Sequence, residues 1–103
     1  MSIQNDIDAA PPGGTVNIIP GIYNEQLVID KPLTLSGPDP GTGVAVIDAA
    51  GLTSGEPTIH ILASDVIVEN LTLQSGPGPG IRVGNATFTN LTGIIIRNNI
   101  IRD

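Results

Sequence analysis

The sequence predicts an all-β fold, a parallel β-helix (β-solenoid) of about three coils behind a short N-terminal capping helix. Residues 66–73 (VIVENLTL) and 94–101 (IIIRNNII) align 28 positions apart, and 33–35 (LTL) fills the same role 33 positions before residue 66. Repeats of roughly 20–50 residues with strand character are typical of solenoids. Aromatic residues make up only 2% of the chain, so the core must come from Val, Ile and Leu, which favour strands.

Short apolar runs between Gly and Pro clusters predict the strands of each coil. Residues 15–19 lead in. Three coils follow, with strands at 26–29, 32–35 and 45–47, then at 58–61, 66–68 and 71–73, and finally at 81–83, 94–96 and 99–101. Three strands in each coil predict three sheets around one core, and the clusters rich in Gly and Pro mark the turns between them. By length and pattern, residues 1–103 form a single domain, with coils over 15–103.

Asn70 lies where the apolar alternation shifts phase by one residue. A single residue in the left-handed region turns the chain sharply, and Asn tolerates that region better than most residue types. Asn98 falls at the same point of the next coil and Gly37 at that of the preceding one, so these three residues predict one structural corner with stacked amides. Outside the coil, Glu69 and Arg97 predict an ion pair at the same 28-residue offset.

The two ends of the sequence differ. Ser2 is a predicted N-cap, and Ile3, Ile7 and Ala10 share one helical face, so residues 1–11 predict a helix that covers the first coil. No comparable segment follows the last strand, and we expect the last coil to expose its edge. The candidate oligomer edge comprises Ile94, Ile96, Asn99, Ile100 and Ile101, and a two-fold dimer would close it.

Residues 12–37 and 58–83, with Gly21, Tyr23 and Glu25 in a G-x-Y-x-E element, resemble the N-terminal half of the pectin methylesterase and pectate-lyase-like superfamily. The last strands also resemble a parallel β-helix repeat of bacterial proteins. The resemblance implies a right-handed coil and relatives that are often extracellular or periplasmic. The family's catalytic aspartates, glutamines and arginine lie on coils that begin near residues 80–83. This chain has Gly80 and Ile81 where a Gln is expected, so we expect no catalytic residues.

Composition excludes several classes of function. The net charge of −6, with four basic residues and few aromatics, argues against nucleic acid or anionic membrane as a partner. The absence of Cys excludes a disulfide framework or thiolate site. No carboxylates stack at the coil offset, so we expect no metal and no cofactor. The chain shows no secretory leader and no membrane-spanning run, and the sequence leaves its localisation open.

The longest connection, residues 84–93, is the candidate ligand or partner loop, with Asn85, Phe88 and Asn90 as its candidate residues. We interpret His60 as a surface residue, and Tyr23 and Glu25 as structural residues rather than sugar ligands. Asn70, Asn85 and Asn90 each begin an Asn-x-Thr glycosylation sequence, which without a leader we interpret as coincidental.

These observations support two functional readings. The first is a non-catalytic module, structural or carbohydrate-binding, that self-associates through its last coil, with a homodimer favoured and a polysaccharide as a further candidate partner. The alternative is the N-terminal portion of a polysaccharide-processing enzyme that lacks its catalytic coils. A fragment without activity of its own is a third reading.

Overall fold

The computed structural model describes residues 2–39, 41–87 and 89–102. Within these residues it contains one helix and eleven short strands. The helix is α1 (Ile3–Ala9), and the strands are β1 (Gly14–Asn17), β2 (Gly21–Tyr23), β3 (Leu27–Ile29), β4 (Leu33–Ser36), β5 (Ala45–Asp48), β6 (Ile59–Ile61), β7 (Val66–Glu69), β8 (Thr72–Gln74), β9 (Ile81–Val83), β10 (Ile95–Arg97) and β11 (Ile100–Arg102).

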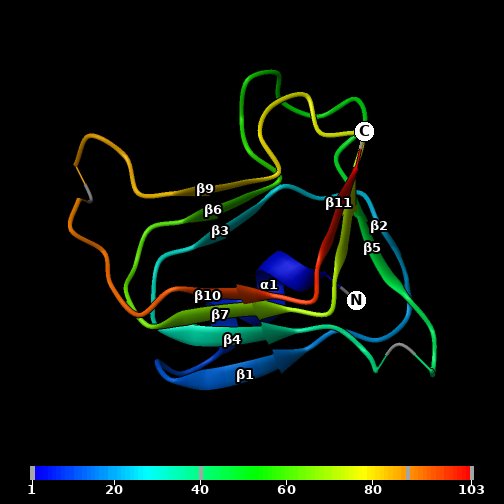
Figure 1. Ribbon diagram of the computed structural model, residues 1–103, viewed down its shortest axis with the longest axis horizontal. Coiled ribbons are helices and arrows are strands. Elements are labelled where there is room, and N and C mark those ends of the chain that lie inside the picture. The colour runs from blue at the N-terminus through cyan, green and yellow to red at the C-terminus, as the bar shows by residue number, and fades with distance from the viewer. Residues whose placement is uncertain (1, 40, 88, 103) are drawn as a thin grey trace.

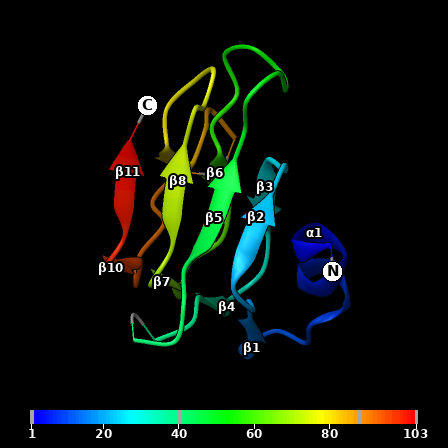
Figure 2. The ribbon, with the colours of Figure 1, turned by 90° about the vertical axis from the view of Figure 1, so that its right-hand side faces the viewer.

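The strands form three parallel sheets that make the sides of a triangular coil (Figure 1). The first sheet contains β1, β4, β7 and β10, the second β2, β5, β8 and β11, and the third β3, β6 and β9. In Figure 1 the chain runs counter-clockwise, and Figure 2 shows that each coil lies nearer the Figure 1 viewer than the one before. The coil is therefore a right-handed parallel β-helix, as the sequence predicts.

Strand pairing follows the predicted repeat. Leu33 pairs with Val66 on the neighbouring strand, and Glu69 pairs with Arg97 28 residues later. Observed strand limits differ from the predicted ones by a residue or two. Register is fixed because a slip of one residue would turn every inward side chain to the solvent.

One strand was missed, and the strand predicted over residues 15–19 belongs to a full first coil instead of leading into one. β1 pairs with β4 over its whole length, and β2, which was not predicted, pairs with β5. Residues 21–23 (GIY) are too short to show alternation, and both Gly21 and Ile22 are exposed. The first coil is thus complete.

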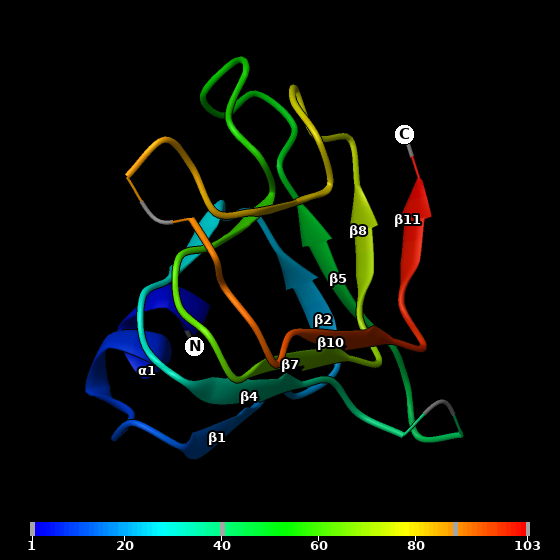
Figure 3. The same ribbon diagram turned by 60° about the vertical axis from the view of Figure 1, so that its left-hand side comes forward.

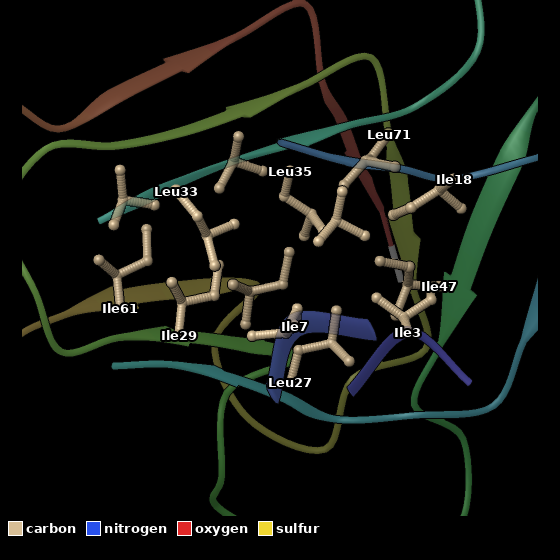
Figure 4. Packing of buried hydrophobic residues seen from close by; sticks show 14 of the residues in the cluster. Ile3, Ile7, Ile18, Leu27, Ile29, Leu33, Leu35, Ile47, Ile61 and Leu71 are labelled. Carbon is tan, nitrogen blue, oxygen red and sulfur yellow. The ribbon is translucent and has the colours of Figure 1, made fainter. Parts of the chain in front are cut away.

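The core consists of stacks of aliphatic side chains that point inward from each sheet (Figure 4). Val16, Leu35 and Val68 form one such stack, on β1, β4 and β7, and all three are at most 5% exposed. Full burial of an aliphatic side chain of this size stabilises the fold by roughly 1.5–3 kcal/mol. The stacks therefore supply the main stabilisation of a chain with almost no aromatic residues.

The predicted corner has the expected left-handed backbone conformation at two of its three positions. Asn70 and Asn98 have φ angles of 58° and 55°, in the left-handed region. Gly37 lies at the same corner, beside Asn70 of the next coil, but does not adopt this conformation, so the prediction of a left-handed residue is wrong there. A Cβ atom on Gly37 would collide with the backbone carbonyl of Asn70 in the next coil, and close approach of the two chains explains the glycine. The described residues show no hydrogen bond between the Asn70 and Asn98 amides.

Helix α1 covers the N-terminal end of the coil (Figure 2). The Oγ of Ser2 accepts the backbone N–H of Asn5, which confirms Ser2 as the N-cap. Ile3 and Ile7 are fully buried against the first coil, as predicted, and Ala10 packs on the same core. Burial of these two isoleucines separates the apolar interior from water at this end.

Residues of the first coil hold both ends of α1. The Glu25 carboxylate accepts the backbone N–H groups of Ile3 at 2.9 Å and of Gln4 at 3.1 Å. The Lys31 ammonium donates to the carbonyls of Asp8 at 3.0 Å and of Ala10 at 2.9 Å. A negative group at the helix N-terminus and a positive group at its C-terminus both interact favourably with the helix dipole and stabilise the helix. Glu25 is therefore a structural residue, as interpreted from the sequence.

Candidate functional site: the open end of the β-helix

The C-terminal end of the coil is uncovered in the described part of the chain (Figure 3). The last inward-facing residue of each sheet is exposed: Val83 by 45%, Ile96 by 43% and Ile101 by 55%. Their counterparts one coil earlier, Ile61, Val68 and Leu73, are at most 1% exposed. We call the surface formed by Val83, Ile96 and Ile101 the open end.

Strand edges surround these side chains. Among the described strands β9 pairs only with β6, β10 only with β7 and β11 only with β8. One edge of each of these last strands therefore faces away from the sheet. Backbone N–H and C=O groups on a free edge can pair with another strand. The open end thus combines apolar side chains with hydrogen-bonding groups.

The predicted edge residues divide between the open end and other positions. Ile96 and Ile101 lie on the open end. Ile94 is half-buried against the core. Ile100, which is 58% exposed, points outward because side chains alternate along β11. Ile95, which was not among the predicted edge residues, points outward from β10 in the same way. Val83 was missed although the sequence places residues 81–83 in the last coil, because the candidate edge was drawn from residues 94–101 alone.

Asn99, a predicted edge residue, lies between the last strands β10 and β11, and its side chain has partners in the preceding coil. Its Oδ1 accepts the backbone N–H of Leu71 at 3.0 Å, and its Nδ2 donates to the carbonyl of Val68 at 2.9 Å. Both partners belong to the preceding coil. The Asn99 side chain therefore joins the last coil to the one before it, the role that was expected of the Asn70 and Asn98 amides.

An ion pair fastens β10 to the rest of the coil. The Arg97 guanidinium lies 2.7 Å from the Glu69 carboxylate, which confirms the predicted pair, and the Ser36 hydroxyl donates to the same carboxylate at 2.9 Å. The hydrogen bond from Arg97, followed by that from Ser36, lowers the pKa of Glu69. The interaction links three successive coils on the outer face of one sheet.

A second polar ladder fastens β11. The Arg102 guanidinium donates to the Gln74 side chain at 2.9 Å, and the Gln74 amide donates to Asp48 at 3.1 Å. The backbone N–H of Ala50, followed by the Gln74 amide, lowers the pKa of Asp48. Side chains on two sheets thus join β10 and β11 to earlier coils, and these contacts hold the open end in a defined conformation.

The candidate loop, residues 84–93, borders a hollow of about 430 Å³ that Arg82, Asn85 and Asn90 help to line. Thr87 donates its backbone N–H to the Asn85 side chain at 2.8 Å. Phe88, on which the prediction of a ligand contact mainly depended, lies outside the described residues. Carbohydrate binding by this loop therefore stays a prediction.

Two other residues singled out from the sequence have structural partners. His60 lies on the outer face of β6, where its Nε2 is 2.9 Å from the carbonyl of Gly84. The Tyr23 hydroxyl donates to the carbonyl of Ile19 at 2.6 Å. The His60 side chain therefore contacts the backbone of the next coil. Tyr23 closes the turn before β2, which fits its interpretation as a structural residue.

A second exposed apolar patch was not predicted. Ile22 (74%), Val44 (55%) and Ile100 (58%) are exposed, and Ile22 and Ile100 lie on the first and last strands of the second sheet. The patch lies on the outer face of the second sheet, whose two edge strands carry Ile22 and Ile100. Recognition of residues 21–23 as a strand would have revealed it.

Among the described residues no cluster of His, Asp and Glu could hold a metal ion. In the same part of the chain no helix is long and apolar enough to cross a membrane.

Comparison with known proteins gives one match. No protein-family model matches the chain, and no solved structure matches it. The chain is 33% identical over 98 residues to a cell surface glycoprotein of Methanothermus fervidus; the match covers 93% of this chain and 15% of the relative. The module therefore resembles one segment of a much longer surface protein, and the resemblance to pectin-processing enzymes stays an expectation.

Proposed function

We propose that this chain is a structural module of a surface protein that associates with a second copy of itself through the open end. The observation that carries the proposal is the exposure of Val83, Ile96 and Ile101, whose counterparts one coil earlier are buried. Exposed apolar groups bordered by free strand edges favour burial against a complementary surface. Another open end offers both apolar groups and unpaired edges.

The N-terminal end of a second copy is a poor partner for the open end. α1 covers that end, and the Gln4 side chain takes up the edge of β3: its Oε1 accepts the Val28 N–H at 2.8 Å and its Nε2 donates to the Val28 carbonyl at 3.0 Å. Two open ends can pair about a two-fold axis. Such contact uses the same surface on both copies and stops at two.

The size of the open end is sufficient for a weak specific contact. The molecule measures 34 × 29 × 23 Å, and Figure 1 looks down the shortest axis onto the triangular end. A triangle inscribed in the larger two dimensions, which include the projecting connections, has an area of roughly 500 Å², so two such ends bury at most about 1,000 Å², the lower limit for a specific interface. We expect a dissociation constant on the order of micromolar.

The surface location is supported by the name of the relative that matches. That relative is named a cell surface glycoprotein, and this chain corresponds to about one-seventh of it. A β-helix whose coils are joined by side-chain ladders can serve as a rigid unit of such a protein. We therefore propose a structural role rather than a catalytic one.

Light scattering over a concentration series tests the proposal. We expect the mass to rise from that of the 10.6 kDa monomer to twice that value. Ile96→Lys and Ile101→Lys place charges on the open end and should hold the chain monomeric. Ile22→Lys is the matched control, because Ile22 is equally apolar and 74% exposed but lies on the side of the first coil. Circular dichroism checks that each variant remains folded.

Three results would overturn the proposal. A wild-type chain that stays monomeric at every concentration excludes self-association. Assemblies that grow without limit exclude the closed two-fold contact. A longer polypeptide that is monomeric while the isolated chain dimerises would show that the open end accepts the next coil of the same molecule.

A further inference from the structure

Three Asn-x-Thr sequences occur in the chain, and the structure places them in different environments. They begin at Asn70, Asn85 and Asn90. Such a sequence accepts an N-linked glycan when a transferase can reach both the Asn and the Thr, which in folded proteins requires a surface loop. Their exposure and backbone contacts therefore distinguish an acceptor from a coincidental match.

The sequence at Asn70 is inaccessible in the folded chain. Leu71 is 2% exposed and Thr72 is 4% exposed. Thr72 also lies inside a sheet, because its strand pairs with β5 on one side and with β11 on the other. A transferase could reach this threonine only after local opening of the structure around it.

The sequence at Asn90 is partly held by the preceding coil. Asn90 and Thr92 are exposed, but Leu91 is half-buried. The Thr92 N–H donates to the Ser64 hydroxyl at 3.0 Å, and the Thr92 carbonyl accepts the Asp65 N–H at 2.9 Å. These two bonds fix the backbone at the threonine, so we expect slow modification here.

The sequence at Asn85 is the accessible one. Asn85, Ala86 and Thr87 are all exposed, and they lie in the connection between β9 and β10 that projects from one corner of the triangle (Figures 1 and 3). The bond from the Thr87 N–H to the Asn85 Oδ1, at 2.8 Å, closes a tight Asx-type turn. This turn holds the first and third residues of the sequence close together at the surface.

We propose that Asn85 is an acceptor for an N-linked glycan. The co-substrate is an oligosaccharide linked to a lipid through phosphate. The Asn85 Nδ2 forms a bond to the anomeric carbon of the sugar, the bond from that carbon to the lipid phosphate breaks, and the lipid phosphate leaves. The proton lost from Nδ2 passes to a base of the transferase. The inference rests on the proposed surface location, since these glycans are added to exported chains.

The test incubates the folded full-length chain with a purified oligosaccharyltransferase and a lipid-linked oligosaccharide. The transferase is first shown to modify a synthetic peptide of residues 82–89, which contains only the acceptor sequence at Asn85. Cleavage after Arg82 and Arg97 separates Asn85 and Asn90 from Asn70, and an Asn90→Gln variant assigns the remaining glycan by mass spectrometry. We expect occupancy at Asn85 at least about tenfold above that at Asn70, in keeping with the burial of Thr72. Asn90 should be intermediate.

Two substitutions at Thr87 separate recognition from folding. Thr87→Val keeps the shape of the side chain but removes the hydroxyl, and it should abolish the glycan at Asn85. Thr87→Ser retains an acceptor sequence and should preserve it. Absence of a glycan on the folded chain, despite modification of the peptide, would overturn the inference. Equal occupancy at Asn70 and Asn85 would also overturn it. Neither result depends on dimerisation, which is measured on the unmodified chain.

Discussion

The two ends of this β-helix are built from equivalent strands, yet one is closed and the other is open. Val16 and Ile96 occupy the same inward stack, at its first and last positions, but Val16 is 5% exposed and Ile96 is 43% exposed. Helix α1 makes the difference, because Ile3 and Ile7 cover the first coil and no described residue covers the last. In a solenoid, burial of a side chain thus depends on the layer above it as much as on its own strand.

The largest effect should come from removing part of the layer that closes the N-terminal end. Ile7→Ala creates a cavity beside a fully buried side chain and should lower the free energy of unfolding by about 2–4 kcal/mol. Ile96→Ala, its counterpart at the open end, should cost less than about 1.5 kcal/mol, because nearly half of that side chain is already in water. Urea unfolding below the dimerisation range measures both. Equal losses of unfolding free energy in the two variants would mean that α1 does not bury the first coil more effectively than solvent-exposed contacts bury the last.

The next largest effect concerns the corner between the coils. Gly37→Ala should lower the free energy of unfolding by roughly 2 kcal/mol or more, because the new methyl group must displace the Asn70 carbonyl. Gly41→Ala is the matched control: a Cβ there meets nothing within 4 Å. If both variants unfold at the same urea concentration, the close approach between coils is not what requires glycine.

A smaller effect should follow from loosening α1 without changing the core. Glu25→Ala removes the acceptor for two backbone N–H groups at the start of α1 and should cost about 1–2 kcal/mol. Glu56→Ala, at an exposed glutamate, should cost almost nothing. Thermal unfolding followed by circular dichroism compares the two. If Glu25→Ala unfolds at the same temperature as the wild-type chain, apolar burial alone holds the helix in place.

The smallest effect is expected at the ion pair beside the open end. The pKa of Glu69 is lower in the folded chain, so its stabilisation is present above the ordinary pKa of about 4.3 and is lost as the pH falls through the folded value. Between pH 6 and pH 3 the wild-type chain should lose more stability than Glu69→Gln, by at most about 1 kcal/mol for so exposed a pair. Parallel pH curves for the two proteins would contradict this assignment.

Much of the fold was predictable because its repeating unit is visible in the sequence. Alternation of Val, Ile and Leu located most strands, the phase shift located Asn70 and Asn98, and one apolar helical face identified α1. Strand β2 was missed because its three residues bury almost nothing on their own. The sequence did not show why residue 37 must be glycine. The cause is the close approach of the Asn70 carbonyl in the next coil, and not the backbone conformation of Gly37 itself.

The candidate site was predictable only in part. The sequence indicated an exposed last coil, and Ile96 and Ile101 confirm two positions of it. Val83, which completes the open end, was missed because the candidate edge was drawn from residues 94–101 alone, although residues 81–83 are predicted to lie in the last coil. The bonds from Asn99 to the previous coil were not predicted, since residue type alone does not show which coil a side-chain amide faces.

The spacing between stacked residues has a practical consequence. Gly14 pairs with Leu33, Leu33 pairs with Val66 and Ile67 pairs with Ile95, so the number of residues per coil changes while the strands stay aligned. The connections absorb the difference, and lengthening a surface loop adds little closure entropy. The chain is therefore suited to peptide display: a foreign epitope inserted within residues 84–93 would be presented from a rigid support whose architecture is unaffected by the length of the insert.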